Sequence, residues 1–374
     1  MKYKFLFFFI SITLSIFLLN LFLSNIKLVD NFEELALGKK NKTVWANIGN
    51  KRIHCGDLNN LDSCLKSYKD SKNKLPVVLW FGNSQLHAIN QFKPEDETAT
   101  AHLHRKLKKY NLYNLTLSQA NASLQEHYLL LSYLIDKIPI KALILPIVFD
   151  DLREDNLRLG IKGILNDKNI KSKISKTFTG KQLIFRFSNK DMAGNETKLV
   201  DEDVKDNFEN LLNKSLIKIW PLWGSREILR GILFGKLYQL RNSILGINAS
   251  TTRKMIPGRY AKNISAYKDI LNLSMDNNIE VLVYIPPIRN DIKIPYNLEN
   301  YTKFKKEIKK IAKENKFYFF NLENLVPPEF WGQKSSTNIK KKLEVDFMHF
   351  QSEGHLLLAN AIFFEISNFF KLNK

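Results

Sequence analysis

Cysteine is nearly absent from this sequence of 374 residues, which contains only Cys55 and Cys64. No histidines accompany this pair at the spacing that zinc ligands show, so we expect neither a metal nor another cofactor. The two cysteines bracket a short polar loop. This separation favours a disulfide formed in an oxidising compartment, with two free thiols as the alternative.

Acidic residues are also few, since 37 Asp and Glu stand against 57 Lys and Arg, a formal net charge of +20. The excess lysines are spread along the chain, as the Lys/Asn bias of a low-GC genome would produce. A membrane surface or an anionic glycan is the alternative explanation for the charge. No nucleic-acid recognition motif accompanies the charge, so we expect no nucleic-acid partner. Internal repeats are absent as well.

One long apolar run is present at the N-terminus. Lys2 and Lys4 precede residues 5–23, an uncharged stretch of about 19 residues that could span a hydrocarbon core of ~30 Å. No Ala-x-Ala cleavage pattern follows it. We therefore predict a signal-anchor transmembrane helix over residues 1–27, with the N-terminus in the cytoplasm and the body outside the inner (cell) membrane, in the periplasm or its equivalent.

The rest of the chain divides by pattern. Residues 28–74 are polar and lysine-rich, and we interpret them as a stem with a small disulfide-tied lead-in. Over residues 75–374, short apolar runs alternate with amphipathic helices, which predicts an α/β domain with a three-layer, doubly wound parallel sheet. The five predicted strands are 77–81, 112–117, 142–148, 281–285 and 317–320. The alternation lapses over about 151–260, which we interpret as a mainly helical insertion.

Within this insertion, residues 226–245 keep helical spacing of apolar residues with arginines and a lysine between them. A helix packed on the core is the first interpretation of this pattern. A helix that rests on a membrane surface, with its arginines at the level of the headgroups, is the alternative.

Two separate motifs carry residues with catalytic potential. The first predicted strand ends at Gly82, which would place Ser84 at the carboxyl edge of the sheet, where open α/β folds have their sites. Near the other end of the chain, Asp346 precedes His349 by three positions. A serine becomes a nucleophile when an imidazole takes its proton and a carboxylate orients that imidazole. The sequence therefore predicts Ser84 as nucleophile, His349 as base and Asp346 as its orienting partner.

These motifs, Gly-x-Ser after the first strand and Asp-x-x-His-Phe-x-x-x-Gly-His before the last helix, resemble those of the SGNH/GDSL hydrolase superfamily. The resemblance covers residue 75 to the C-terminus except about 151–260. It implies a flavodoxin-like sheet of five parallel strands and the same roles for Ser84, His349 and Asp346. With its single N-terminal anchor, the chain is similar to the membrane-anchored branch that includes glycan and teichoic acid acylation proteins. That branch implies an integral membrane acyltransferase as partner.

The chain departs from the family pattern at each motif. Asn83 stands where the family usually has Asp, and the second block, over 114–119, lacks its glycines. In the third block, over 148–151, Asp150 replaces the asparagine that donates a hydrogen bond to the oxyanion. An ionised carboxylate has no proton to donate.

The oxyanion donors must therefore come from elsewhere, with an absent oxyanion hole as the alternative. We expect them among the backbone N–H groups of Ser84 and Gln119 and the side chains of Gln119 and Asn121. Asn83, Asp150 and Arg289 are candidates for contacts with the substrate. Arg289 follows a strand and could clamp a phosphate or carboxylate, with a structural salt bridge as the alternative.

The sequence predicts an extracytoplasmic enzyme that uses Ser84 for O-acyl transfer to, or ester hydrolysis on, a cell-surface glycan or another acylated envelope polymer. The alternative is a non-catalytic SGNH-like envelope protein that binds glycan or scaffolds an acylation complex.

Overall fold

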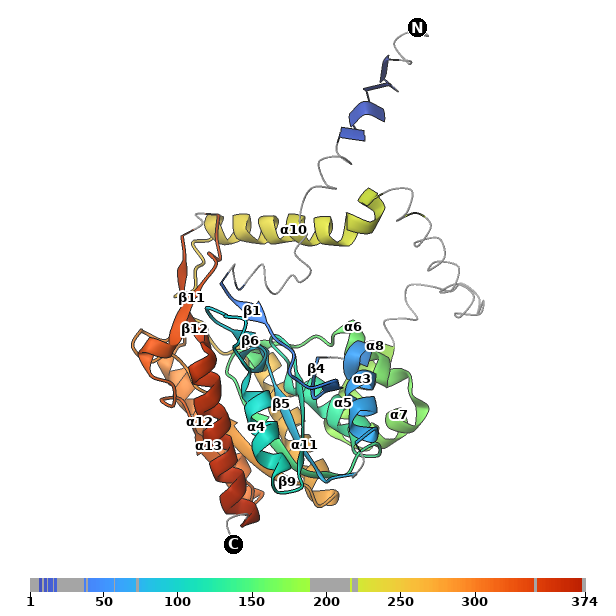
Figure 1. Ribbon diagram of the computed structural model, residues 1–374, viewed down its shortest axis with the longest axis vertical. Coiled ribbons are helices and arrows are strands. Elements are labelled where there is room, and N and C mark those ends of the chain that lie inside the picture. The colour runs from blue at the N-terminus through green and yellow to red at the C-terminus, as the bar shows by residue number, and fades with distance from the viewer. Residues whose placement is uncertain are drawn as a thin grey trace.

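The structure of the chain is a computed structural model (Figure 1). It describes residues 40–56, 58–71, 74–188, 221–339 and 342–371, together with residues 37 and 216 and several residues between 7 and 18. Most of the predicted signal-anchor lies outside these residues. In the part that is described, no helix is both long and apolar enough to cross a membrane.

A parallel sheet forms the centre of the fold, and all of its neighbouring strands are parallel. In order across the sheet, the six strands are β10 (Tyr318–Asn321), β9 (Glu280–Ile285), β8 (Ile140–Pro146), β5 (Val77–Gly82), β7 (Tyr113–Ser118) and β4 (His54–Cys55).

Five of these strands match the predicted ones, and their order is that of a doubly wound, flavodoxin-like sheet. The sixth, β4, corrects the prediction of five strands. It comes from residues 28–74, which we expected to form a stem, and pairs with β7 through only two residues. The chain winds outward in both directions from β5, which has β7 on one side and β8 on the other. The point where the strand order reverses therefore lies between β5 and β8.

Helices cover both faces of the sheet. On one face lie α5 (Leu124–Leu134), α11 (Pro257–Asp276) and α12 (Leu298–Glu314), and on the other lie α4 (Ala99–Lys108) and α13 (Ser352–Phe370).

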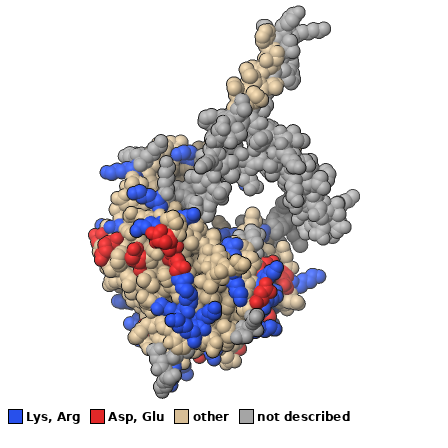
Figure 2. Space-filling model, viewed as in Figure 1, with Lys and Arg blue, Asp and Glu red and all other residues tan. Residues whose placement is uncertain are grey.

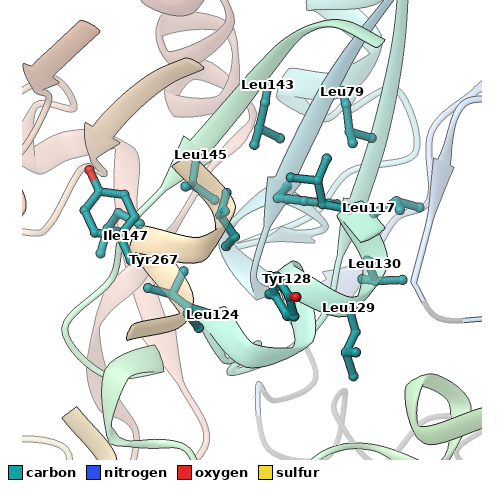
Figure 3. Close-up of a cluster of buried hydrophobic side chains, with 14 of the residues drawn as sticks. Leu79, Leu117, Leu124, Tyr128, Leu129, Leu130, Leu143, Leu145, Ile147 and Tyr267 are labelled. Atoms are coloured by element: carbon teal, nitrogen blue, oxygen red, sulfur yellow. The ribbon is translucent and has the colours of Figure 1, made fainter. Parts of the chain in front are cut away.

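Strand β5 supplies both cores because its side chains alternate. Val77, Leu79 and Phe81 belong to the cluster under α5 and α11, whereas Val78 and Trp80 pack with residues of α4 and α13. All five are fully buried. Figure 3 shows part of the first cluster, where leucines of the sheet meet Tyr128, Tyr267 and other side chains of α5 and α11. A strand buried on both sides explains the continuous apolar run in the sequence.

The region that interrupts the alternation is largely helical where it is described. It contains η2 (Asp151–Arg153), α6 (Leu159–Lys162), η3 (Gly163–Asn166), α7 (Lys168–Ile174), α8 (Phe178–Ser188) and α10 (Pro221–Ile244). The apolar side chains of α6, η3, α7 and α8 join the cluster under α5. Helix α10 does not follow the core-packed interpretation, because most of its described apolar side chains are exposed.

Small elements surround the carboxyl edge of the sheet. β1 (Lys42–Thr43) pairs with β6 (Ala88–Ile89), β2 (Asn47–Ile48) with β3 (Lys51–Arg52), and β11 (Trp331–Lys334) with β12 (Glu344–Phe350), all antiparallel. Helix α3 (Leu58–Lys69) carries Cys64, which forms a disulfide with Cys55 of β4. On the face shown in Figure 2, Lys and Arg lie at several separate places with Asp and Glu between them, in keeping with the scattered lysines of the sequence.

Candidate active site

Ser84 lies where the strand order of the sheet reverses. It is the first residue of η1 (Ser84–Leu86), which follows β5 directly. Asn83 caps this turn, because its side-chain Oδ1 accepts a hydrogen bond from Gln85 N at 3.0 Å. Gly82 permits the sharp exit from the strand, since a Cβ at this position would overlap with the side chain of Leu86. Ser84 therefore stands at the edge where doubly wound folds bind their ligands.

The structure brings Ser84 together with the two residues from the far end of the chain. Ser84 Oγ lies 2.9 Å from His349 Nε2, and His349 Nδ1 lies 2.9 Å from Asp346 Oδ2. Ser84 and His349 are 265 positions apart in the sequence. Strand β12 carries both Asp346 and His349 and packs beside η1. This line of hydroxyl, imidazole and carboxylate is the arrangement that activates a serine.

Asp346 is held as an ionised acceptor. Its Oδ1 accepts the backbone N–H groups of Met348 at 3.0 Å and His349 at 3.1 Å. Burial by itself would raise the pKa of the Asp346 carboxyl, but the charge of His349 and its hydrogen bond outweigh burial and lower that pKa to about 2. An ionised Asp346 at neutral pH fixes the proton of His349 on Nδ1. The lone pair of Nε2 then faces the Ser84 hydroxyl.

Two residues that the sequence analysis did not single out attach β12 to η1. Gln85 Nε2 donates to Met348 O and to Pro287 O, both at 2.8 Å. Asn90 Nδ2 donates to His349 O at 3.3 Å. Gln85 is 2% exposed and Asn90 is fully buried. Their closeness to Ser84 in the sequence was the only available signal, because their acceptors come from remote segments.

Asn83 contacts the acidic pair that follows β8. Its Nδ2 donates to Asp151 Oδ2 at 3.1 Å. Asp151 is buried, and burial together with the charge of Asp150 raises the pKa of its carboxyl well above the usual range. Asp150 itself accepts from Arg153 at 3.0 Å, from Arg253, and from the Tyr296 hydroxyl at 3.1 Å. Asp150 is thus engaged by partners within the fold, which argues against its predicted contact with the substrate.

The structure shows how far the predicted oxyanion donors are already bonded. Gln119 N donates to Gly82 O at 3.2 Å, and one N–H of its side-chain amide donates to Gly56 O at 2.7 Å, which leaves the second N–H of that amide as its remaining donor. Asn121 is exposed on a turn with a φ of 51°. Among the described residues, nothing accepts a hydrogen bond from the N–H of Ser84. Of the predicted set, this N–H is the donor that is available next to the nucleophile.

Arg289 forms a salt bridge within the protein. Its Nε and Nη2 donate to the two carboxylate oxygens of Asp291 at 2.7 and 3.0 Å, and its Nη1 donates to Gly332 O at 3.0 Å. These contacts follow the structural alternative that the sequence analysis left open, and they leave Arg289 less available as a clamp for substrate.

A buried histidine cluster lies beside the site. His54 Nε2 and His87 Nδ1 are each 2.6 Å from Ser118 Oγ. The ring of Trp45 stacks on His87, with centroids 4.7 Å apart. Burial, with the charge of His87, lowers the pKa of His54 well below its usual value. Ser118 pairs with Gly82 across the sheet, so the cluster supports the strand end that carries Ser84.

In the part of the chain that the structure describes, no group of three or more His, Cys, Asp or Glu side chains could hold a metal ion. The site is instead that of an α/β protein with a Ser–His–Asp line at the carboxyl edge of a doubly wound sheet.

Comparisons with known proteins add little to this geometry. No family model matches the chain, and no curated protein matches it significantly. Among solved structures, it is similar to a variant of an acetyl-xylooligosaccharide esterase from Geobacillus, with a TM-score of 0.36 and 10% identity over 79% of this chain and 96% of that one.

Proposed function

We propose that this protein is an SGNH-type serine enzyme that transfers or hydrolyses O-acyl groups of a cell-surface glycan. The observation that carries the proposal is the unbroken hydrogen-bonded line from Ser84 through His349 to Asp346, placed at the reversal point of the sheet. A serine, a base and an orienting carboxylate in this order can form and resolve an acyl-serine.

In the proposed reaction, Ser84 Oγ attacks the carbonyl carbon of the ester while His349 Nε2 takes the hydroxyl proton. The negative charge that develops on the carbonyl oxygen is met by the N–H of Ser84. When the bond to the sugar oxygen breaks, His349 returns the proton to that oxygen and the acyl group remains on Ser84. Water or an acceptor hydroxyl then gives its proton to His349 and attacks the acyl-serine, and His349 returns that proton to Ser84 Oγ as the bond between Ser84 and the acyl group breaks.

The test is fluorophosphonate labelling of the purified protein beside its Ser84→Ala and His349→Ala variants. We expect labelling in the wild type and its loss in both variants. Ser118→Ala is the matched control, because Ser118 also lies within hydrogen-bond distance of a histidine but is buried. Labelling that survives Ser84→Ala in a folded protein would contradict the assignment of the nucleophile.

The location of the protein in the cell belongs to the same proposal. The apolar run at residues 5–23 supports an anchor in the cell membrane with the body outside it. An integral membrane acyltransferase would supply acyl groups across the bilayer. Protease added to intact spheroplasts should digest the body, and full protection of the body would refute an extracytoplasmic location.

A second candidate function is that of a non-catalytic glycan-binding or scaffolding protein. It is favoured by the engagement of the backbone N–H and of one side-chain N–H of Gln119, which leaves fewer oxyanion donors in the predicted set. A correctly folded wild type that takes no fluorophosphonate label, alone or with membranes that contain an acyltransferase partner, would favour this candidate.

A further inference from the structure

Helix α10 carries an apolar surface that the fold does not cover. Leu233, Phe234, Leu237, Tyr238 and Ile244 are between 49% and 74% exposed. In Figure 1 the helix lies apart from the three-layer body and approaches it near the tips of β11 and β12. Large apolar side chains gathered on one helix are uncommon on the surface of a soluble domain and indicate an interaction site.

The polar side of α10, not its apolar side, faces the body. Gln239 Nε2 donates to Ser336 O at 3.4 Å, Asn242 Nδ2 donates to Thr337 O at 2.8 Å, and Ser243 Oγ accepts from Ile339 N at 3.0 Å. With ~100° of rotation per residue, these three side chains point to one side of the helix. The exposed apolar residues 233, 234, 237, 238 and 244 fall on the opposite side. A helix that packed on the core would be turned the other way.

Positive charge accompanies the apolar surface. Arg230 and Arg241 fall within the apolar side of the helix by the same rotation, whereas Lys236 falls beside Ser243. The Arg241 guanidinium stacks over the ring of Tyr238, 4.3 Å from its centroid. Long cationic side chains next to aromatic rings suit the boundary between acyl chains and anionic headgroups, where the stem is apolar and the charge is paired.

The position of α10 agrees with a membrane. In Figure 1 the described residues of the N-terminal apolar run lie beyond α10, on the same side of the body. The exposed side chains of that run include the apolar Phe7, Phe8 and Phe17, with the small polar Ser11, Thr13 and Ser15 among them. The β1–β6 and β11–β12 ribbons lie between the sheet and α10, so the edge of the sheet that carries Ser84 faces this side too.

We propose that the apolar face of α10 (residues 233, 234, 237, 238 and 244) docks on the surface of a bilayer that contains anionic phospholipids. The N-terminal run enters the same bilayer, and the docked helix holds the Ser84 edge toward the membrane surface. A second copy of this chain would be a different occupant, and the experiment below separates the two. The proposal goes beyond the proposed catalytic function and does not depend on it.

The experiment is an environment-sensitive probe on the full chain. Cys55 and Cys64 form a disulfide, so Phe234→Cys supplies the one thiol available for an NBD label. Phe364→Cys is the matched control, because Phe364 lies on α13 and is 59% exposed against 60% for Phe234. On vesicles of phosphatidylcholine with phosphatidylglycerol, we expect a blue-shifted emission and quenching by nitroxide-labelled lipids at position 234, with neither at 364.

The same labels distinguish the alternatives. Arg230→Gln with Arg241→Gln should reduce the quenching at position 234, as should vesicles of phosphatidylcholine alone. Equal spectra at positions 234 and 364 on anionic vesicles would overturn the proposal. A blue shift at 234 without lipid that grows with protein concentration would also overturn it, in favour of a second copy. Ser84→Ala should leave the spectra unchanged, so this test fails or succeeds separately from the catalytic one.

Discussion

Replacement of Asp346 by Asn should disable the site by changing the tautomer of His349. Asp346 Oδ1 accepts two backbone N–H groups, those of Met348 and His349, while Oδ2 accepts the imidazole Nδ1–H. An asparagine has one acceptor oxygen, which the two backbone donors would retain. Its NH₂ group would then face His349 Nδ1, which can accept this bond only if the ring proton moves to Nε2. A protonated Nε2 points a donor at Ser84 and cannot take its proton.

The expected loss of rate follows from this change in the tautomer of His349. In serine hydrolases with this triad, the Asp→Asn exchange lowers kcat by about 10⁴-fold, which corresponds to about 5.4 kcal/mol of activation free energy. We expect a loss of the same order in the rate of fluorophosphonate labelling of Asp346→Asn at neutral pH. The fold should persist because the replacement keeps the shape of a side chain that is 1% exposed, and a melting curve checks this.

Asp291→Asn is the control for a lost carboxylate near the same end of the sheet, since Asp291 pairs with Arg289 and does not touch the triad. Its labelling rate should equal that of the wild type. Labelling of a folded Asp346→Asn at the wild-type rate would refute the reasoning, because His349 would then need no orienting carboxylate.

Three further predictions concern the residues around the site. Burial lowers the pKa of His127 to about 4, below the ~6.5 of an unfolded chain, so acidification from pH 7.5 to 5.5 protonates this residue only in the unfolded state and costs the fold about 1 kcal/mol. In urea titrations, the free energy of unfolding of His127→Phe should fall by about that much less over this interval than that of the wild type. Equal losses would contradict protonation of His127 as the cause. Phe81→Leu, which removes the ring stacked on His127 but not the titrating group, should show the wild-type loss. Replacement of Cys55 and Cys64 together by Ser opens a loop of sequence separation 9 and should lower the free energy of unfolding by about 2–3 kcal/mol; reduced wild type should unfold at the same urea concentration as the variant. Gln85→Ala leaves the carbonyl groups of Pro287 and Met348 without their donor. It should lower the free energy of unfolding by about 1–3 kcal/mol in thermal melts and slow the labelling of Ser84. An unchanged stability and an unchanged labelling rate would show that Gln85 does not hold β12.

The parallel sheet was predictable because its central strands are buried on both faces. The run from Val77 to Phe81 reads as apolar without alternation, since its side chains feed two cores in turn. Gly82 and Ser84 marked the end of that strand. The pairing of Ser84 with His349 was predicted from the two motifs and not from the sheet, because His349 lies on β12, which pairs with β11 outside the central sheet.

Other features depend on contacts that no local pattern records. Strand β4 is two residues long, too short to show a period, and sits in a polar lysine-rich stretch. The bonding of Gln119 could not be predicted either, because Gly56, from that same stretch, accepts one of its two side-chain amide protons. The orientation of α10 depends on hydrogen bonds to residues 336–339, nearly a hundred positions away. Its periodicity showed an apolar side and left open what that side faces.

The scarcity of oxyanion donors bears on the kind of reaction this site would support. Loss of one such donor typically lowers kcat by ~10²–10³-fold, and of the predicted donors the backbone N–H and one side-chain N–H of Gln119 are already engaged. A site with a complete Ser–His–Asp line and an incomplete oxyanion hole should be slow toward free esters in water. We expect its activity to rise when a partner at the membrane surface supplies the missing donor and the acyl group together. The increase in labelling of Ser84 on addition of acyltransferase-containing membranes measures this contribution, and the absence of any increase would place the whole reaction in the chain's own residues.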